Sequence, residues 1–334
     1  MKGDLCMCTA VTYRTKDHYF GRTLDYEKSF GEKVVITPRN FSIRFRKTGE
    51  FSRHYALIGM AAVVDDYPLY YDAANEYGLS MAGLNFPGNA FYGGVMEGKD
   101  NVAPFELILW ILGQCKTVEE VKKIMEHTQI MHMDFREDLK TTPLHWMAAD
   151  ETGSIVIESM KNGIKIYDNP VGVLTNNPPF DQQLFGLNNY MSLSTETPKN
   201  YWPKTAGLKT YSRGMGALGL PGDLSSASRF VRAAFTKMHS LSDESESESV
   251  SQFFHILGSV TQQRGLVRLD DNVYEKTIYT SCCNTNQGIY YYKTYDSHHI
   301  CAVSMRNENL EGKELFAYSL VGKQAIYFQN PPLH

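Results

Sequence analysis

One cysteine near the start of the chain has the setting of a catalytic nucleophile. The segment Met7-Cys8-Thr9 leads into a strand-like run, and a second such run carries Arg22 and Asp25 at its end. If Met7 and everything before it were removed, the freed α-amine of Cys8, with a reference pKa of about 7.7 to 8.0, would lie beside a thiol whose reference pKa is about 8.5. One residue would then supply both nucleophile and base, and Arg22 and Asp25 could orient the amine and keep the sulfur reactive.

Each of these residues has a more ordinary interpretation when it is taken alone. Cys8 would then be a buried strand cysteine, and Arg22 with Asp25 would be a surface pair at a turn. Cys6 is a poorer nucleophile because it is not followed by the strand pattern and would shift the register of every partner. Only the combination points to nucleophilic catalysis.

Metal chemistry is poorly supported by the sequence. The adjacent pair His298-His299 would point to opposite faces of a strand, and Cys282-Cys283 could not both bind one ion from a regular strand. His145, between two apolar residues, is interpreted as a satisfied core histidine rather than a ligand or base. We therefore expect no metal site.

Cofactor binding is equally unsupported. The segment Gly214-Met-Gly-Ala-Leu-Gly219 has the letters of a dinucleotide-binding fingerprint. No strand precedes it, and Pro221 follows where a helix should run, so no βαβ unit encloses it. We interpret it as a glycine-rich loop and expect no cofactor.

The elements that must position Cys8 are mostly strands. Runs rich in β-formers alternate with turn residues and predict strands, three of them after residue 143 forming a meander. The predicted strands span residues 9–13, 18–22, 33–37, 55–64, 80–84, 144–149, 154–159, 163–167, 277–283, 288–295, 300–304 and 314–318.

Helical periodicity and capping boxes predict four helices, at residues 103–115, from Thr117 onward, at 226–238 and at 249–260. The last of these begins at Ser249 and follows an acidic linker at 242–248. Residues 185–221 carry no sustained period and predict a long surface excursion. Because strands and helices do not alternate regularly, we expect a layered α+β fold rather than a parallel doubly wound sheet.

Composition and charge narrow the function further. The chain has 334 residues, 43% of them hydrophobic, with six cysteines and a formal net charge of −4. These values exclude disorder and a disulfide scaffold, and they make a nucleic-acid partner improbable. No apolar stretch is long enough to span a membrane, so we expect a cytoplasmic protein with reduced thiols and no membrane insertion.

The combination of motifs resembles the choloylglycine hydrolase family, the N-terminal-nucleophile amidases that include bile salt hydrolases and penicillin V acylases. The resemblance spans the chain from Met7. It rests on Met7-Cys-Thr9, Phe20-Gly-Arg22 with Asp25, Asn75-Glu-Tyr-Gly-Leu79, Ala82-Gly-Leu-Asn-Phe-Pro87, Leu174-Thr-Asn-Asn-Pro178, Leu220-Pro-Gly-Asp223 and Ala227-Ser-Arg-Phe230.

The resemblance implies a set of catalytic residues. Cys8 would be the nucleophile with its freed amine as base, Arg22 and Asp25 would fix and polarise it, Asn85 and Asn176 would complete an oxyanion hole, and Arg229 would lie near the nucleophile. Asparagine donors suit that position because they can meet the developing negative charge without titrating. The reaction would be amide hydrolysis through a thioester on the cysteine.

The resemblance also implies a substrate, a fold and an assembly. Asn85 looks like the bile salt hydrolase version of a position where penicillin V acylases commonly carry tyrosine, which favours glycine- or taurine-conjugated bile salts. The implied fold is the four-layer αββα sandwich of N-terminal-nucleophile hydrolases, with residues 8–334 as one catalytic domain and residues 185–221 used in assembly of a homotetramer. Residues matching an apolar substrate pocket are Leu24, Val64, Tyr71, Phe135 and Leu139.

Residues 1–6 depart from the family pattern, because close relatives begin at the Met-Cys pair, here Met7-Cys8; residues 1–7 together form a leader ahead of Cys8. We expect this leader to be absent from the mature enzyme, either because translation begins at Met7 or because the leader is cleaved. Two alternatives stay open. One is a penicillin V acylase of the same family. The other is a non-catalytic steroid-binding protein that retains its leader, since an acylated Cys8 nitrogen cannot act as a base.

Overall fold

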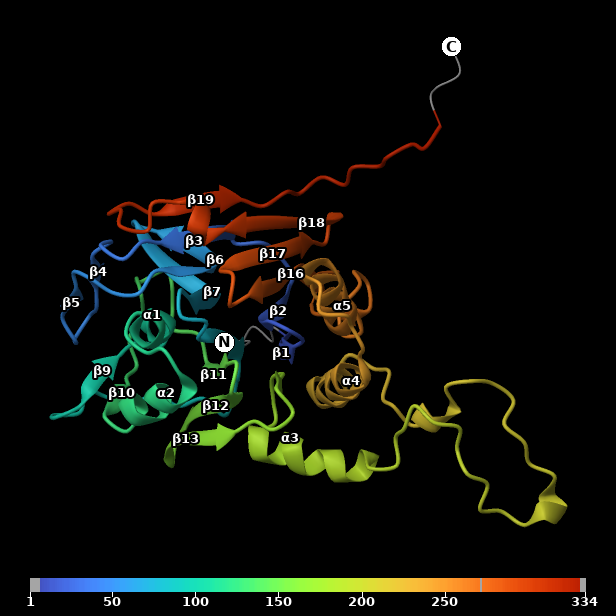
Figure 1. The fold of residues 1–334 in the computed structure, drawn as a ribbon. Helices are drawn as coiled ribbons and strands as arrows, with labels where there is room; N and C mark the ends of the chain where they lie inside the picture. The colour runs from blue at the N-terminus through green and yellow to red at the C-terminus, as the bar shows by residue number, and fades with distance from the viewer. Residues whose placement is uncertain (1–6, 271, 331–334) are drawn as a thin grey trace.

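The computed structural model describes residues 7–270 and 272–330. Within these residues the chain forms two large antiparallel sheets flanked by helices, which confirms the predicted α+β class (Figure 1). We refer to the eight-stranded sheet as the larger sheet and to the seven-stranded sheet as the smaller sheet.

The larger sheet is buried on both faces. Its spatial order is β13 (Gly163–Asp168), β12 (Gly153–Met160), β11 (Leu144–Asp150), β8 (Ser80–Asn85), β7 (Tyr67–Asn75), β6 (Leu57–Val64), β3 (Lys33–Thr37) and β19 (Phe316–Ser319). Because successive side chains on a strand point to opposite faces, neighbours on one strand enter different cores. On β11, for example, Trp146 packs in the core beneath the first two helices, and Met147 packs in the core that faces the smaller sheet.

The smaller sheet carries the start of the described chain. Its order is β14 (Val173–Leu174), β1 (Met7–Arg14), β2 (His18–Tyr26), β16 (Tyr274–Asn284), β17 (Ile289–Thr294) and β18 (Ser297–Ser304), and the short β15 (Val267–Arg268) pairs with β16. Gly21 lets β2 approach β16 closely, since a Cβ atom there would lie 2.1 Å from the carbonyl oxygen of Ser281. This contact gives the Phe20-Gly-Arg22 motif a structural reason for its glycine.

Helices lie on both sides of the sheets (Figure 1). On one side a 3-10 turn, η1 (Pro104–Glu106), leads into α1 (Leu107–Leu112), and α2 (Val118–Met125) follows. On the other side are α4 (Ser226–His239) and α5 (Glu246–Gly258), with α3 (Phe180–Gly186) below them. Short pairs β4 (Ile43–Arg44) with β5 (Glu50–Phe51), and β9 (Asp100–Val102) with β10 (Thr128–Ile130), complete the described strands.

Several sequence predictions of these elements need correction. The helix predicted at 103–115 is a 3-10 turn followed by the short α1, and the predicted list omits both β7 and α3. The predicted start of α5 at Ser249 is wrong, because Ser245 is the N-cap and its hydroxyl accepts from the backbone N–H of Glu248. Part of the predicted acidic linker therefore forms the first turn of α5, where negative side chains interact favourably with the helix dipole.

The predicted excursion at 185–221 is confirmed as an irregular segment. Beyond the end of α3 it contains only the 3-10 turns η2 (Leu187–Tyr190), η3 (Lys204–Ala206) and η4 (Met215–Ala217), the last lying within the glycine-rich loop. In Figure 1 this segment forms a long arm that leaves the body of the molecule between α3 and α4. Among the described residues, no helix is long and apolar enough to cross a membrane.

Candidate active site

Cys8 is buried near the start of β1, on the smaller sheet. It is the second residue of β1, only 1% of its surface is exposed, and it pairs with Leu24 on β2. Paired residues of antiparallel strands point to the same face, and residues two apart on β2 share that face as well. The Cys8 side chain therefore shares a face with Leu24 and Arg22, and this face is directed toward the larger sheet.

Asn176 brings a distant part of the chain to Cys8. It follows β14, which pairs with β1, and its Oδ1 accepts a hydrogen bond of 2.9 Å from the backbone N–H of Cys8. Its own N–H donates to the hydroxyl of Ser226 at 2.8 Å, and its Nδ2 donates to the carbonyl oxygen of Asn85 at 2.8 Å. The two asparagines named by the sequence are therefore in contact with each other.

Arg229 binds both Cys8 and Asn176. It lies in the first turns of α4 with no exposed surface. Its Nη1 donates to the Cys8 carbonyl oxygen at 2.6 Å and to the Thr9 hydroxyl at 2.7 Å, and its Nη2 donates to Asn176 Oδ1 at 2.7 Å. A planar guanidinium is suited to this arrangement, because its donors have a fixed geometry and its positive charge is permanent.

Arg22 connects the two sheets. From β2 its Nη1 donates to the backbone oxygens of Tyr71 on β7, at 3.1 Å, and of Gly83 on β8, at 2.5 Å. Gly83 is two residues before Asn85, so Arg22 ties the strand that carries Asn85 to the strand beside Cys8. The side chain is 1% exposed, on the face of β2 that it shares with Leu24, the partner of Cys8.

Arg22 and Asp25 are not the adjacent pair that their spacing suggests. They lie an odd number of positions apart on β2, so their side chains point to opposite faces. Asp25 accepts from the hydroxyls of Thr277, at 2.6 Å, and Thr23, at 3.0 Å. Burial raises the pKa of the Asp25 carboxyl to about 7, and the positive charge of Arg229 opposes this rise.

Glu275 is a site residue that the sequence analysis missed. It lies on β16 near Asp25, is 1% exposed, and accepts a 2.8 Å hydrogen bond from the backbone N–H of Met7. Burial, together with the charge of Asp25, raises the pKa of its carboxyl to about 9. Glu275 and Thr277 lie two apart on β16, so their side chains share one face of the strand. Because β16 contains several other polar residues, this spacing alone is a weak signal in the sequence.

The residues predicted to line a substrate pocket fall into two groups. Val64 pairs with Tyr67 at the end of the β6–β7 hairpin, the Tyr67 and Phe135 rings lie 5.7 Å apart, and Leu139 belongs to the same loop as Phe135. These residues thus gather at one corner of the molecule. Leu24 lies beside Cys8 and Tyr71 contacts Arg22, so the second group borders the cysteine.

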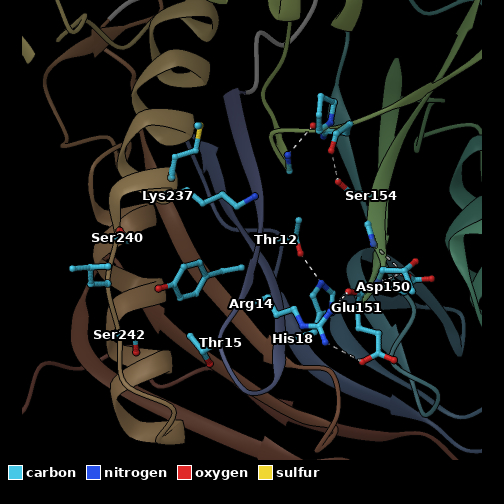
Figure 2. Close-up of a pocket in the computed structure, with 18 of the residues that line it drawn as sticks. Thr12, Arg14, Thr15, His18, Asp150, Glu151, Ser154, Lys237, Ser240 and Ser242 are labelled. Carbon is cyan, nitrogen blue, oxygen red and sulfur yellow. Dashed lines mark hydrogen bonds and ion pairs between the residues drawn. The ribbon is translucent and has the colours of Figure 1, made fainter. Parts of the chain in front are cut away.

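A cavity of about 640 Å³ lies elsewhere, at the opposite end of the β1–β2 hairpin from Cys8 (Figure 2). It is lined by Thr12, Arg14, His18, Asp150 and Lys237 among others, and by none of the predicted site residues. The amine of Lys237 donates to the Val171 carbonyl oxygen at 2.7 Å, and burial lowers its pKa to about 8. The structure therefore does not identify this cavity with the predicted site.

The structure does not test the predicted leader or the expected absence of a metal site. Of the predicted leader, only Met7 is described. Residues 1–6, which include Cys6, lie outside the described residues. In the part of the chain that the structure describes, no three His, Cys, Asp or Glu side chains are grouped so that they could hold a metal ion.

Comparisons with known proteins give this geometry a context. A family described as linear amide C–N hydrolases, choloylglycine hydrolase family, matches residues 8–318. The chain is 57% identical over 324 residues to a bile salt hydrolase/transferase of Lactiplantibacillus plantarum, covering 97% of this chain and 100% of that relative.

Solved structures extend the comparison. A mutant conjugated bile acid hydrolase from Clostridium perfringens superposes with a TM-score of 0.90 at 38% identity, covering 97% of this chain and 100% of that one. A penicillin V acylase from Agrobacterium tumefaciens has a TM-score of 0.71 at 18% identity, with 93% and 90% covered, so this likeness concerns the fold alone.

Proposed function

The chain belongs to the choloylglycine hydrolase family of linear amide C–N hydrolases, and we propose that it hydrolyses glycine- and taurine-conjugated bile salts through an N-terminal cysteine. Two observations support the substrate. The relative from Lactiplantibacillus plantarum, 57% identical over nearly the whole chain, is named a bile salt hydrolase/transferase. The second is the resemblance of Asn85, within Gly83-Leu-Asn-Phe-Pro87, to the bile salt hydrolase version of a position where penicillin V acylases commonly carry tyrosine.

The observation that carries the proposed mechanism is the position of Asn176 Oδ1. This oxygen accepts hydrogen bonds both from the nitrogen of Cys8 and from Arg229. Once residues 1–7 are absent, the same nitrogen is a primary amine with one N–H held by Oδ1 and its lone pair available for a proton.

In the first step the Cys8 amine takes the thiol proton, and the thiolate attacks the amide carbonyl carbon of the substrate. The side-chain amides of Asn176 and Asn85 donate to the developing oxyanion. As the C–N bond breaks, the ammonium on Cys8 gives its proton to the leaving nitrogen of glycine or taurine, and a bile acyl thioester remains on the sulfur.

In the second step water replaces the departed amino acid. The neutral amine of Cys8 accepts a proton as the water oxygen attacks the thioester carbonyl carbon. When the C–S bond breaks, the proton returns to sulfur and the free bile acid leaves. The reaction is balanced by water alone, and every proton passes through atoms of one residue.

The sterol body of the substrate requires an apolar surface beside the cysteine. Leu24 and Tyr71 border Cys8 and Arg22, while Val64, Phe135 and Leu139 gather at the corner next to the β6–β7 hairpin. We assign these five residues to the walls of the substrate site, since apolar and aromatic side chains suit a steroid.

The proposal includes an architecture and an assembly. The order of the layers, a helix pair, the larger sheet, the smaller sheet and a second helix pair, supports the four-layer αββα sandwich (Figure 1). We propose that residues 8–334 form one catalytic domain. On the arm at 185–221, Tyr201, Trp202 and Tyr211 are 87%, 71% and 81% exposed. Such large exposed aromatic side chains favour an interface between copies of the chain, and we propose a homotetramer.

The test is a substrate panel on one preparation of mature enzyme. Glycocholate, taurocholate and phenoxymethylpenicillin are compared by kcat/KM, which reports discrimination between competing substrates. The proposal predicts faster turnover of the bile salts. A negligible bile salt rate with rapid penicillin cleavage would favour the penicillin V acylase alternative, and binding of bile salts without cleavage would favour the steroid-binding alternative.

A further inference from the structure

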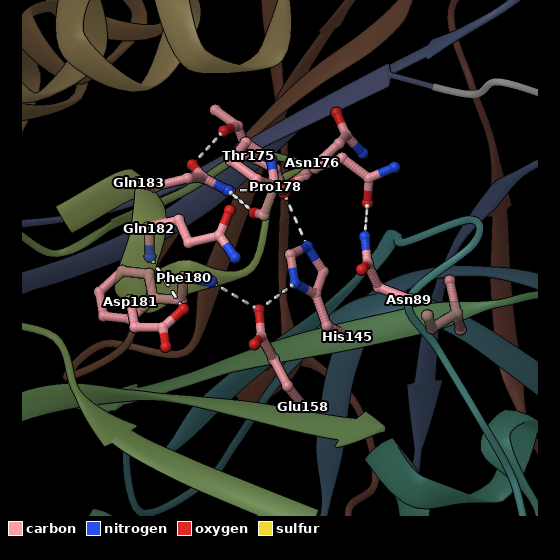
Figure 3. A network of polar contacts seen from close by, with 12 residues as sticks. Asn89, His145, Glu158, Thr175, Asn176, Pro178, Phe180, Asp181, Gln182 and Gln183 are labelled. Carbon is pink, nitrogen blue, oxygen red and sulfur yellow. Dashed lines mark hydrogen bonds and ion pairs between the residues drawn. The ribbon is translucent and has the colours of Figure 1, made fainter. Parts of the chain in front are cut away.

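A fully buried pair of titratable side chains, His145 and Glu158, lies beside the segment that carries Thr175 and Asn176 (Figure 3). His145 on β11 and Glu158 on β12 both have 0% exposed side-chain surface, and Nδ1 of the histidine lies 3.0 Å from Oε1 of the glutamate. The other ring nitrogen, Nε2, lies 2.8 Å from the carbonyl oxygen of Thr175. Each nitrogen of the imidazole therefore has an oxygen partner.

The contacts fix how many protons this pair holds. The Thr175 carbonyl can only accept, so Nε2 of His145 must carry a proton. Oε1 of Glu158 also accepts from the backbone N–H of Phe180 at 3.0 Å, and one further proton lies between Oε1 and Nδ1. Whichever of those two atoms holds it, the pair as a whole is neutral and permanently donates to Thr175.

Thr175 precedes Asn176, and the surrounding side chains hold both residues. The Thr175 hydroxyl donates to Gln183 Oε1 at 2.7 Å, and Gln183 Nε2 donates to the Asn176 carbonyl oxygen at 2.5 Å. The Asn176 N–H donates to Ser226. His145 adds a further backbone contact to this segment, the one to the Thr175 carbonyl oxygen.

The same imidazole also contacts the neighbour of the second asparagine. Its ring stacks on Phe86, with centroids 4.2 Å apart and planes inclined by 7°. Phe86 directly follows Asn85 at the end of β8. One side chain thus touches the residue next to each of the two predicted oxyanion donors, which come from parts of the chain far apart in sequence.

We propose that His145 and Glu158 are positioning residues that fix Asn85 and Asn176 relative to each other for the attack on the amide carbonyl. This inference rests on the proposed function. His145 acts through Thr175 and Phe86 and does not contact the substrate. A misplacement of about 1 Å in such donors costs on the order of 10²-fold in rate, so the pair should govern kcat rather than substrate binding.

The test compares two substitutions of His145. His145→Phe keeps an aromatic ring against Phe86 but removes both N–H groups, whereas His145→Gln can still donate to the Thr175 carbonyl oxygen. For glycocholate we expect kcat of His145→Phe to fall by about 10- to 100-fold with KM unchanged, and His145→Gln to recover a substantial part of kcat. Leu109→Ala, a destabilising change in the separate core beneath α1, controls for lowered stability.

A second variant covers the case in which His145→Phe does not fold. Glu158→Gln has the same shape, but its amide can satisfy only one of the two partners of Oε1. The amide oxygen accepts from the Phe180 N–H but offers no proton to Nδ1 of His145, and the NH2 group does the reverse, so kcat should fall with KM unchanged. The inference is overturned if the folded variants keep the kcat of the starting enzyme, or if Leu109→Ala loses as much kcat as His145→Phe. A starting enzyme that does not cleave glycocholate would instead overturn the proposed function, and the same assay reports it.

Discussion

The backbone nitrogen of Cys8 donates to Oδ1 of Asn176 across 2.9 Å, and this bond joins β1 to the segment that follows β14. Arg229 donates to the same oxygen from α4 at 2.7 Å. A single side-chain amide therefore orients the nitrogen that the proposed mechanism uses as its base. The nitrogen of the same amide, Nδ2, donates to the carbonyl oxygen of Asn85.

Replacing the nucleophile tests the role of its sulfur. A serine hydroxyl is much harder to deprotonate than a thiol, so the same weak amine activates it poorly. We expect Cys8→Ser to lower bile salt hydrolysis by about 10² to 10⁴, the range attributed to an effective proton transfer. Circular dichroism should show an unchanged fold, because the two side chains differ by one atom. A serine variant with full activity would contradict the mechanism.

Asn176→Ala tests the oxyanion role. The substitution removes Nδ2 as a donor, and loss of one oxyanion donor costs about 10² to 10³ in kcat. Asn188→Ala is the matched control, since Asn188 is exposed and its amide donates only to the nearby Phe185 carbonyl oxygen. Steady-state kinetics should show the fall for Asn176 alone. Equal rates for the two variants would exclude Asn176 from the reaction.

Arg229→Lys tests whether the guanidinium geometry matters beyond its charge. A lysine cannot donate at once to Cys8, Thr9 and Asn176, and each buried acceptor left without its donor costs about 1 to 3 kcal/mol. We expect the free energy of unfolding, measured by urea denaturation, to fall by at least about 1 kcal/mol, the cost of one such acceptor. We also expect a loss of activity. Arg306→Lys, at an exposed arginine whose guanidinium donates to the Asn286 carbonyl oxygen, should change both quantities much less.

The stability of the folded chain should depend on pH through Glu275. Burial, with the charge of Asp25, raises the pKa of the folded carboxyl to about 9 from an ordinary value of 4.5. Between these values the folded chain holds a proton that the unfolded chain has released, so the free energy of unfolding falls as pH rises toward 9. Glu275→Gln cannot titrate and should lack this contribution.

Urea denaturation at several pH values from about 5 to 9 measures the effect. The stability of Glu275→Gln relative to the starting protein should increase as pH rises through this window. Parallel stability curves for the two proteins would show that the carboxyl does not have a raised pKa in the folded state.

Much of the site could be predicted because its parts lie on strongly patterned segments. The runs that became β1 and β2 are short, rich in β-formers and bounded by turn residues, so both strands could be predicted, with Arg22 on the second. The predicted ranges, 9–13 and 18–22, were too short and left Cys8 and Asp25 just outside the strands that carry them. Asn85, Asn176 and Arg229 came from the family resemblance rather than from any local pattern, and the structure brings both asparagines and Arg229 together at Cys8.

What the sequence could not predict depends on contacts between distant residues. The strand β7 contains Pro68 and Asp72, which disfavour strands. Asp72 is accommodated there because the hydroxyls of Tyr279 and Tyr290, from the other sheet, donate to its carboxylate at 2.8 and 2.6 Å. Arg22 and Asp25 lie on opposite faces of β2, since strand alternation separates residues an odd number of positions apart, and this too follows from the observed strand rather than from their spacing alone.

The central claim is that the reacting sulfur and a free terminal amine belong to the same residue, Cys8. The most direct test is intact-mass and N-terminal analysis of enzyme that turns over glycocholate at its full rate, with the fraction of reactive sites titrated by a thiol alkylating agent. The account predicts that the active molecules begin at Cys8 and that the alkylated mass lies on this residue. Fully active molecules that retain residues ahead of Cys8 would contradict it.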